Sequence, residues 1–322
     1  MTARKTISLL LPAYNEAANL PEVFRRVEAV AAVLQPRYDV EFLLMDNCST
    51  DGTSALCREK CAQDDRYRYL RYSRNFGAEA SMLAGLDHAR GDAAVFVYTD
   101  LQDPPELIPE MAAKWEEGNE VVYGLVRRRN DYSLFKTVGA KIYYGLLRRL
   151  ADIALPENAT DFRLMDRKVL DALGQLRERD RYLRGLVHWV GFRQTGIPYD
   201  RSPRVHGETK YPIWTSVKFG LNAVFCFSSK PLQIATYLGF FFTLLSVALG
   251  FFYLLLKLAP ALGLPLPADI APPLGVTTIV LLILLNLGLN TLFLGIVGQY
   301  LARVYNQGKQ RPLYIVDEKI GF

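Results

Sequence analysis

The sequence contains neither of the two glycine-rich patterns that cradle phosphate in many nucleotide-dependent proteins, G-x-G-x-x-G and G-x-x-x-x-G-K-[ST]. Their absence argues against a dinucleotide-binding fold and against a P-loop. Cysteine is scarce, with 4 residues in a chain of 322, and this fits a reducing compartment. No second pair of Cys or His accompanies Cys57 and Cys61, so no zinc site is predicted. The 3 histidines also lack metal-ligand spacing.

Charge is missing from two long segments of the chain. No Asp, Glu, Lys or Arg occurs in residues 231–256 or in residues 270–302. Each segment exceeds the roughly 20 residues that a helix needs to cross the core of a bilayer. We therefore predict two transmembrane helices within residues 231–302, and we prefer them to long buried helices of a soluble protein.

The placement of Lys and Arg around these segments predicts their orientation. Residues 258–274 connect the two segments and contain no Lys or Arg, whereas Lys218 and Lys230 precede the first segment and Arg303 and Lys309 follow the second. No apolar signal-peptide region opens the chain. We expect a multi-pass protein of the cell (inner) membrane, with both termini and the large N-terminal domain in the cytoplasm.

The net charge of +5 is modest, and it favours a membrane partner. The basic residues alternate with apolar ones near the two hydrophobic segments, which favours anionic lipid over nucleic acid. Residues 133–150 and 213–227 combine aromatic and basic residues in an amphipathic pattern. We expect both to form helices in the lipid interface, with ordinary surface helices as the alternative.

The first 126 residues alternate between strand and helix patterns. Such an alternation is typical of an α/β domain with a mostly parallel, Rossmann-like sheet covered by helices on both faces. The expected strands are residues 7–11, 40–45, 67–72, 93–99 and 121–126, and the expected helices are residues 20–34, 51–61, 78–88 and 105–117.

Polar side chains follow four of these strands at their carboxyl ends, the edge at which open α/β sheets bind ligands. Each group alone is explained by capping or loop chemistry, but four groups on one edge favour a ligand site. The groups are Pro12, Tyr14, Asn15 and Glu16; Asp46, Asn47 and Ser49; Ser73, Arg74 and Asn75; and Asp100 and Gln102.

The segment after the fourth strand carries the most specific signal. Asp100 and Gln102 offer hard oxygen ligands that suit Mg²⁺ or Mn²⁺ bound to a substrate diphosphate. Asp103 precedes two prolines, and it fits the N-cap of the next helix, with Pro104 at the first position and Glu106 closing a capping box. A cap does not account for Asp100, which lies before it.

An ordered set of motifs resembles the polyprenyl-phosphate glycosyltransferases, which are family 2 enzymes of the GT-A fold related to dolichol-phosphate mannose synthase and to bactoprenol glucosyltransferases. The motifs are PAYNE (12–16), DNCSTDGT (46–53), SRNFG (73–77), DLQDPPEL (100–107), DFRLMDR (161–167) and R-x-x-R-x-x-G-x-T-K-Y (201–211). The resemblance covers nearly the whole chain. It implies a catalytic GT-A domain at 1–211, a juxtamembrane segment at 212–230, a two-helix membrane domain at 231–302 and a cytoplasmic tail at 303–322.

The resemblance further implies an inverting enzyme that moves a sugar from a nucleotide-sugar donor, with UDP as the expected nucleotide, to a polyprenyl phosphate such as undecaprenyl or dolichyl phosphate. It assigns a nucleotide pocket to Pro12, Tyr14, Glu16, Asp46, Asp51 and Asn75, in which Asp46 binds the nucleotide base. It assigns a divalent metal to Asp100 and Gln102. The family often has a further acid at the position of Tyr98, so the metal here has fewer carboxylates. The identity of the transferred sugar is not predicted. The protein is expected to be either a monomer or a homo-oligomer.

The remaining site residues are charged. Asp161 matches a position that often supplies the base in inverting enzymes, and we expect it to act here as an orienting group. The acceptor phosphate needs cations, for which Arg127, Arg128, Arg129, Lys136 and Arg163 are candidates. Arg201, Arg204 and Lys210 lie on a Gly- and Pro-containing segment suited to a lid, or form a membrane-facing basic strip. Asp166 is expected to cap the helix after it.

Two other functions compete with this interpretation. A processive polysaccharide synthase needs more membrane helices and usually a Gln-x-x-Arg-Trp motif, and residues 181–189 lack that spacing. A non-catalytic membrane scaffold or sugar-nucleotide sensor is compatible with Tyr98 in place of an acid.

Overall fold

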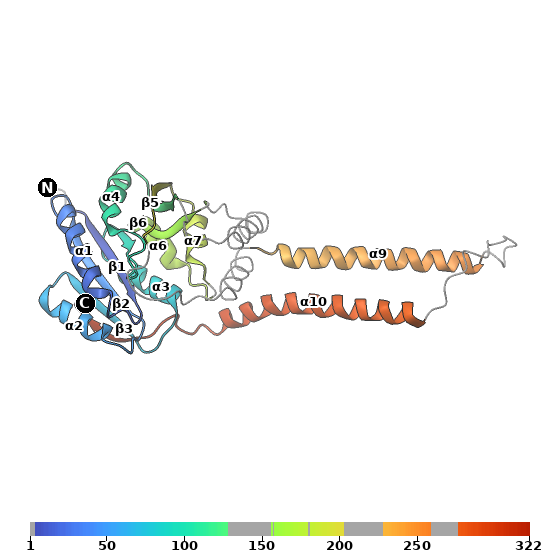
Figure 1. Cartoon of the computed structure of the whole chain (residues 1–322). Helices are drawn as coiled ribbons and strands as arrows, with labels where there is room; N and C mark the ends of the chain where they lie inside the picture. Colours follow the sequence, from blue (N-terminus) through green and yellow to red (C-terminus); the bar gives the residue numbers. More distant parts are fainter. Residues whose placement is uncertain (1–3, 128–155, 157, 180, 203–227, 259–275) are drawn as a thin grey trace. The chain divides into compact units, whose positions relative to one another are not determined.

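The computed structural model describes residues 4–127, 156, 158–179, 181–202, 228–258 and 276–322 (Figure 1). The chain divides into two compact units. Gln310–Phe322 belongs to the same unit as the N-terminal part of the chain, and Ser228–Lys309 forms the other. The C-terminal segment is therefore part of the first domain, which differs from the separate tail expected from residue 303 onwards.

The described residues of the first unit form an eight-stranded mixed sheet in the order β7-β5-β6-β4-β1-β2-β3-β8. Four neighbouring strands, β4, β1, β2 and β3, run parallel, and β5 and β7 are also parallel to each other. β6 is antiparallel to β4 and β5, and β8 is antiparallel to β3. The strands are β1 (Thr6–Ala13), β2 (Asp39–Asp46), β3 (Tyr67–Tyr72), β4 (Ala93–Phe96), β5 (Val121–Val126), β6 (Ala159–Asp166), β7 (Gln194–Tyr199) and β8 (Val316–Ile320).

Helices cover both faces of the sheet because the strand side chains alternate between the two faces. In β1, Ile7 and Leu9 point into one apolar core with residues of α1, α2 and α4, whereas Leu10 points into a second core with residues of α3, α6 and α7. The helices are α1 (Leu20–Leu34), α2 (Thr53–Gln63), α3 (Ala78–His88), α4 (Ile108–Glu116), α6 (Arg167–Gln175) and α7 (Leu183–Trp189), with a 3₁₀ turn η1 (Pro105–Leu107) before α4.

The predicted α/β fold is confirmed in its parallel part. The first five strands and the four helices between them all occur, with β4 ending at Phe96 instead of residue 99. The sequence patterns did not identify β6, β7 and β8. A buried Arg163 interrupts the apolar pattern of β6, Gly and Pro interrupt β7, and three consecutive charged residues fill the middle of β8.

The second unit contains two long apolar helices, α9 (Lys230–Leu258) and α10 (Val276–Gly308). Within them, Lys230–Leu249 and Leu285–Gly308 are long and apolar enough to cross a membrane. Large hydrophobic side chains such as Phe240, Phe251 and Leu294 are exposed along both helices, as expected for side chains that face lipid. The predicted interfacial segments 133–150 and 213–227 lie outside the described residues.

Candidate functional site

The loops that follow β1, β2, β3 and β4 meet at the carboxyl edge of the parallel strands. We call residues 12–19, 46–53, 73–77 and 97–104 the rim. The register of β1 and β2 pairs Pro12 with Met45 and Ala13 with Asp46, so the first two loops leave the sheet at the same level. The predicted nucleotide residues Tyr14 and Glu16 follow directly, and Tyr14 is exposed.

The first two rim loops are tied together by side chains that bind backbone atoms. The amide of Asn15 donates to Ser49 Oγ at 2.9 Å, and the amide of Thr50 donates to Asn15 Oδ1 at 2.8 Å. Asn15 and Cys48 both adopt left-handed backbone angles, with φ of 55° and 61°. Left-handed residues other than glycine are uncommon and are often found where the surrounding structure fixes a functional loop. The first two loops thus form one fixed wall of the rim.

Asp51 fastens this wall to the start of α2. Its carboxylate accepts from the amide of Ala17 at 3.1 Å and from the amide of Thr53 at 2.9 Å. Burial acts to raise the pKa of Asp51, but these hydrogen bonds outweigh it and hold that pKa below its ordinary value. Asp51 is therefore an ionised residue that shapes the predicted nucleotide pocket.

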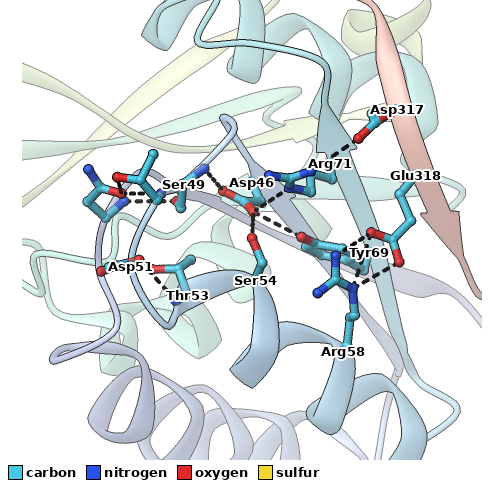
Figure 2. A network of polar contacts seen from close by, with 12 residues as sticks. Asp46, Ser49, Asp51, Thr53, Ser54, Arg58, Tyr69, Arg71, Asp317 and Glu318 are labelled. Carbon is cyan, nitrogen blue, oxygen red and sulfur yellow. Dashed lines mark hydrogen bonds and ion pairs between the residues drawn. The ribbon is translucent and has the colours of Figure 1, made fainter.

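Asp46 lies beneath the rim loops, at the centre of the polar network in Figure 2. Its side chain is fully buried. Oδ1 accepts from the amide of Ser49 at 2.9 Å, and Oδ2 accepts from the hydroxyls of Ser54 at 2.5 Å and Tyr69 at 2.9 Å. Asp46 thus fixes the loop through both carboxylate oxygens, and its contact with a nucleotide base stays a prediction.

The C-terminal strand reaches the same network from the other side. Figure 2 shows Asp317 and Glu318 of β8 directed toward Arg71 and Arg58. The Arg58 guanidinium donates to both carboxylate oxygens of Glu318, with Nε at 2.9 Å and Nη2 at 2.8 Å. Arg71 places Nη1 3.1 Å from Asp317 Oδ2 and Nε 3.8 Å from Asp46 Oδ2. Residues at the end of the chain therefore support the loop that holds Asp46.

Asn75, on the third rim loop, is joined to the second. The Asn47 side chain donates to Asn75 Oδ1 at 3.0 Å, and its own oxygen accepts from the amide of Phe76 at 2.9 Å. The structure therefore brings all the predicted nucleotide residues, from Pro12 to Asn75, to adjoining parts of the rim.

The fourth rim loop presents Asp100 and Gln102 on either side of a buried residue. Leu101 has a left-handed φ of 52° and is 1% exposed, whereas Asp100 and Gln102 are half-buried. The amide of Gln102 lies 3.3 Å from Asp100 Oδ1. An apolar anchor with an unusual backbone conformation thus keeps two oxygen-bearing side chains at the surface of the rim.

These two side chains fit a divalent cation that also binds substrate. Among the residues that the structure describes, no group of three or more His, Cys, Asp or Glu is arranged for a metal. Mg²⁺ is usually bound by one or two carboxylates together with substrate phosphates and water, and the donor set of Asp100 and Gln102 suits that mode. Tyr98 adds no ligand, because its hydroxyl lies 3.3 Å from Met82 Sδ of α3.

The predicted cap at Asp103 is wrong. Asp103 is 3% exposed, accepts a short hydrogen bond from the Tyr199 hydroxyl and lies 3.1 Å from Arg201 Nε. No side chain caps η1 or α4, and Glu106 pairs with Arg26 instead. The carboxylate turns inward because the Tyr199 phenol at the end of β7 and the Arg201 guanidinium after it lie next to it. Burial raises the pKa of Asp103.

This arrangement predicts unequal effects of two alanine substitutions. Asp103→Ala removes the acceptor of a buried hydroxyl, so it should lower the free energy of unfolding by about 2–3 kcal/mol. Glu106→Ala breaks an exposed pair and should cost less than about 1 kcal/mol. The thermal unfolding midpoints of the two variants in detergent measure the difference. Equal and small shifts of the two midpoints would support the capping box and contradict the buried contact of Asp103.

Asp161 and Arg163 lie at the beginning of β6. Because β6 is antiparallel to β4, with Ala93 opposite Asp166 and Val95 opposite Leu164, its first residues lie at the rim beside the end of β4. The predicted cap at Asp166 is confirmed, since its side chain accepts from the amide of Lys168 at 2.9 Å.

A third residue joins Asp161 and Arg163, and the sequence analysis missed it. Arg184 of α7 donates from Nε to Asp161 Oδ1 at 3.0 Å and from Nη2 to Oδ2 at 2.6 Å. Arg163 places Nη2 3.3 Å from Asp161 Oδ1. We call Asp161, Arg163 and Arg184 the Asp161 cluster. The Arg-rich segment around residues 181–184 was the available signal, but only the fold shows which arginine faces the carboxylate.

The Asp161 cluster has two cations for one carboxylate and lies close to the acids of the fourth rim loop. Burial raises the pKa of Asp161, but Arg184 and then Arg163 and Arg201 outweigh it, so the net pKa lies below its ordinary value. His188 nearby is kept neutral, because burial, Arg163 and Arg184 lower its pKa to about 4. Both Asp100 and Asp161 act electrostatically on Asp103, which places the two ends of the predicted catalytic set in one region.

The predicted cations are only partly described. Arg127 follows β5 and is exposed, and Arg201 is 40% exposed while paired with Asp103. The amide of Ser202 donates to the backbone oxygen of Gln102 at 3.0 Å, so the start of the predicted lid adjoins the predicted metal ligand. Arg128, Arg129, Lys136, Arg204 and Lys210 lie outside the described residues.

Comparison with known proteins adds independent findings. Residues 8–174 match the family described as glycosyl transferase family 2. The chain is 40% identical over 316 residues to an uncharacterised glycosyltransferase of Synechocystis sp., covering 98% of this chain and 96% of that protein. It is 32% identical over 310 residues to the bactoprenol glucosyl transferase of Shigella phage SfV, covering 96% of this chain and 97% of that one.

Solved structures were also compared with this chain. The S. aureus TarS 1–349 structure in complex with UDP-GlcNAc has a TM-score of 0.45 and 15% identity, covering 69% of this chain and 66% of that chain. Mannosyl-3-phosphoglycerate synthase from Rubrobacter xylanophilus has a TM-score of 0.46 and 17% identity, covering 68% and 72% of the two chains.

Proposed function

This chain belongs to glycosyl transferase family 2 and is a glycosyltransferase, and from that premise we propose that it transfers a sugar from a nucleoside diphosphate to a polyprenyl phosphate at the cytoplasmic face of a membrane. The donor is a UDP-sugar, and the configuration at the anomeric carbon is inverted. The proposal rests mainly on one observation: three groups of residues lie at the same rim. They are the fixed loops around Asp46 and Asp51, the pair Asp100 and Gln102, and the Asp161 cluster.

The reaction forms a bond between a phosphate oxygen of the lipid and the anomeric carbon, while the bond from that carbon to the nucleoside diphosphate breaks. Negative charge therefore develops on the leaving diphosphate. Asp100 and Gln102 would hold Mg²⁺ or Mn²⁺, which supplies Lewis-acid neutralisation of that charge when bound. Arg201 lies beside this loop, where a cation stabilises the same charge.

The acceptor needs cations more than it needs a strong base. A phosphate monoester has a second pKa near 6, so it is mostly dianionic at pH 7. Arg163 is 1% exposed, and among the described residues neither its Nε nor its Nη1 has a hydrogen-bond partner. The buried guanidinium adds positive charge behind Asp161, which favours a dianionic phosphate at the rim. Asp161 then orients the reacting groups instead of activating the nucleophile.

The two long apolar helices give the reaction its location. A polyprenyl tail is costly to remove from a bilayer, at about 0.8 kcal/mol per CH₂ group, so the enzyme must work at the membrane surface. β8 follows α10 and pairs with β3 of the catalytic sheet. Both ends of the helical unit therefore connect to one folded domain, which supports an even number of crossings and a shared cytoplasmic side for both termini.

Transfer by the purified full-length protein tests the proposal. The protein in detergent is mixed with undecaprenyl phosphate, Mg²⁺ or Mn²⁺, and one of a set of UDP- and GDP-sugars. We expect a lipid-linked monosaccharide with one UDP-sugar, and an anomeric configuration opposite to that of the donor. A sugar polymer would indicate a processive synthase, and the absence of transfer from every donor would favour a scaffold or sensor.

A further inference from the structure

Arg184 is the one member of the Asp161 cluster without a role in the proposed function. It lies on α7 (Leu183–Trp189), and its guanidinium grips Asp161 with both oxygens engaged, at 3.0 Å and 2.6 Å. A two-bond fork of this kind fixes the plane of a carboxylate as well as its position. A single hydrogen bond leaves the carboxylate free to rotate.

Arg163 does not replace this fork. It contacts Asp161 through one atom only, Nη2, at 3.3 Å from Oδ1, and the same atom donates to the backbone oxygen of Thr160 at 2.9 Å. Its side chain is 1% exposed, whereas that of Asp161 is 31% exposed. The two arginines thus differ in position. Arg163 is buried behind the carboxylate, and Arg184 fixes the direction in which the carboxylate points.

The backbone of Arg184 is itself fixed. Leu183, Leu186 and Val187 of α7 are buried in the core shared with α3 and α6. The amide of Leu183 donates to Glu79 Oε2 of α3 at 3.1 Å. Arg184 therefore presents its guanidinium from a helix that is held by its apolar side and at its first residue, as a positioning group requires.

From this geometry we infer that Arg184 is a positioning residue for sugar transfer: it holds Asp161 ionised and in one orientation at the rim, where Asp161 acts as hydrogen-bond acceptor for the reacting groups. The inference rests on the proposed function. Arg184 acts through Asp161 and needs no contact with donor or acceptor. Substitution of Arg184 should then lower the fraction of Asp161 that is both ionised and correctly oriented.

The charges around Asp161 give this inference a pH signature. An opposite charge within about 4–6 Å lowers the pKa of a carboxyl by about 1–3 units, and the pKa of Asp161 lies below its ordinary value. Without Arg184, burial is less well opposed and the pKa rises. Among the described residues, the groups that act electrostatically on Asp161 or are acted on by it include Arg184 of α7, Arg163 of β6, Arg201 after β7, Tyr98 after β4, Glu79 of α3 and Asp103 before η1.

The test compares Arg184→Met and Arg184→Lys with the wild type in sugar transfer from pH 5 to pH 9. The matched control is Arg25→Met, because Arg25 makes the same two-bond fork to Glu22, at 2.7 Å and 2.6 Å, on the exposed face of α1. The ratio of variant to wild-type rate is plotted against pH, so that titration of the acceptor phosphate cancels.

We expect the acid limb of Arg184→Met to lie about 1–3 pH units above that of the wild type, so that the rate ratio rises with pH. Arg184→Lys keeps the charge and loses the fork, and it should fall between the two. Arg25→Met should give a flat ratio near one. A ratio for Arg184→Met that is equally low at every pH would reduce Arg184 to a structural residue, and an unchanged rate would overturn the inference.

A second readout needs no turnover, so it separates this inference from the proposed function. Because the folded pKa of Asp161 is depressed, its contribution to stability is present above the unfolded pKa and is lost as pH falls through the folded pKa. Arg184→Met should therefore lower the thermal unfolding midpoint more at pH 7 than at about pH 3, which lies below the ordinary Asp pKa of 3.8. If the wild type transfers no sugar but this difference appears, the proposed function fails while the pairing of Arg184 with Asp161 stands. An equal loss at both pH values would contradict the pairing.

Discussion

Replacing Asp100 with alanine is expected to lower the rate of sugar transfer by about 10³-fold or more in a protein that is still folded. A metal that neutralises a leaving diphosphate is worth several kcal/mol in the transition state, and about 1.4 kcal/mol corresponds to a factor of ten in rate. Asp100 is the only carboxylate in the described pair with Gln102, since Tyr98 stands where a second acid would be and turns toward Met82. Within the described ranges, few other ligands are left to hold the cation.

The side-chain geometry suggests the right comparison for this variant. Asp100→Asn keeps the size of the residue and an oxygen near the amide of Gln102, so its loss of rate reports the charge. Asp171→Ala removes an exposed acid of α6 and should leave the rate unchanged. Initial rates at saturating donor, with a circular dichroism spectrum of each variant, make the measurement. A wild-type rate for Asp100→Ala would remove Asp100 from the site.

Ending the chain after Lys309 should destabilise the catalytic domain, although the deleted residues lie beyond the hydrophobic helices. The deletion removes β8 from the edge of β3, the two-bond fork between Arg58 and Glu318, and the partner of Arg71 beside Asp46. It also removes Tyr314, whose hydroxyl donates to Asp87 at 2.8 Å. Together these contacts should contribute several kcal/mol, and their loss should lower the unfolding midpoint by about 10 °C or more.

Exchanging the charges of Arg58 and Glu318 measures how much of this loss of stability comes from that pair. Arg58→Glu and Glu318→Arg should each lower the unfolding midpoint, because each places like charges together. The double exchange should recover most of that loss. UDP affinity is measured on the same samples, since the pair lies one strand away from the network of Asp46. A truncated protein with unchanged stability and unchanged UDP affinity would make β8 dispensable.

The sequence predicted the parallel half of the fold because its information is local there. Leu20, Val23 and Val27 repeat with the period of a helix, and all three are buried in α1. The polar groups after β1, β2, β3 and β4 were placed on one edge by a general rule of parallel sheets. That rule needs no knowledge of which distant segments meet.

The errors and omissions all concern contacts between distant segments. Asp103 has the local signature of a helix cap, but the Tyr199 hydroxyl, 96 residues away, draws it into the interior. Arg184 is one of several arginines in its segment, and its selection depends on how α7 packs on α3. β8 has three consecutive charged residues, as edge strands often do. Nothing local connects it with β3, where Arg71 lies 246 residues before its partner Asp317.

The central claim is that the rim binds a nucleoside diphosphate through a cation held by Asp100 and Gln102. Electron paramagnetic resonance of Mn²⁺, titrated into the full-length protein with and without UDP, tests it most directly. The account predicts saturable Mn²⁺ binding that strengthens markedly when UDP is present, and its loss in Asp100→Asn with the fold intact. Mn²⁺ binding that ignores UDP, or that survives in Asp100→Asn, would contradict the claim.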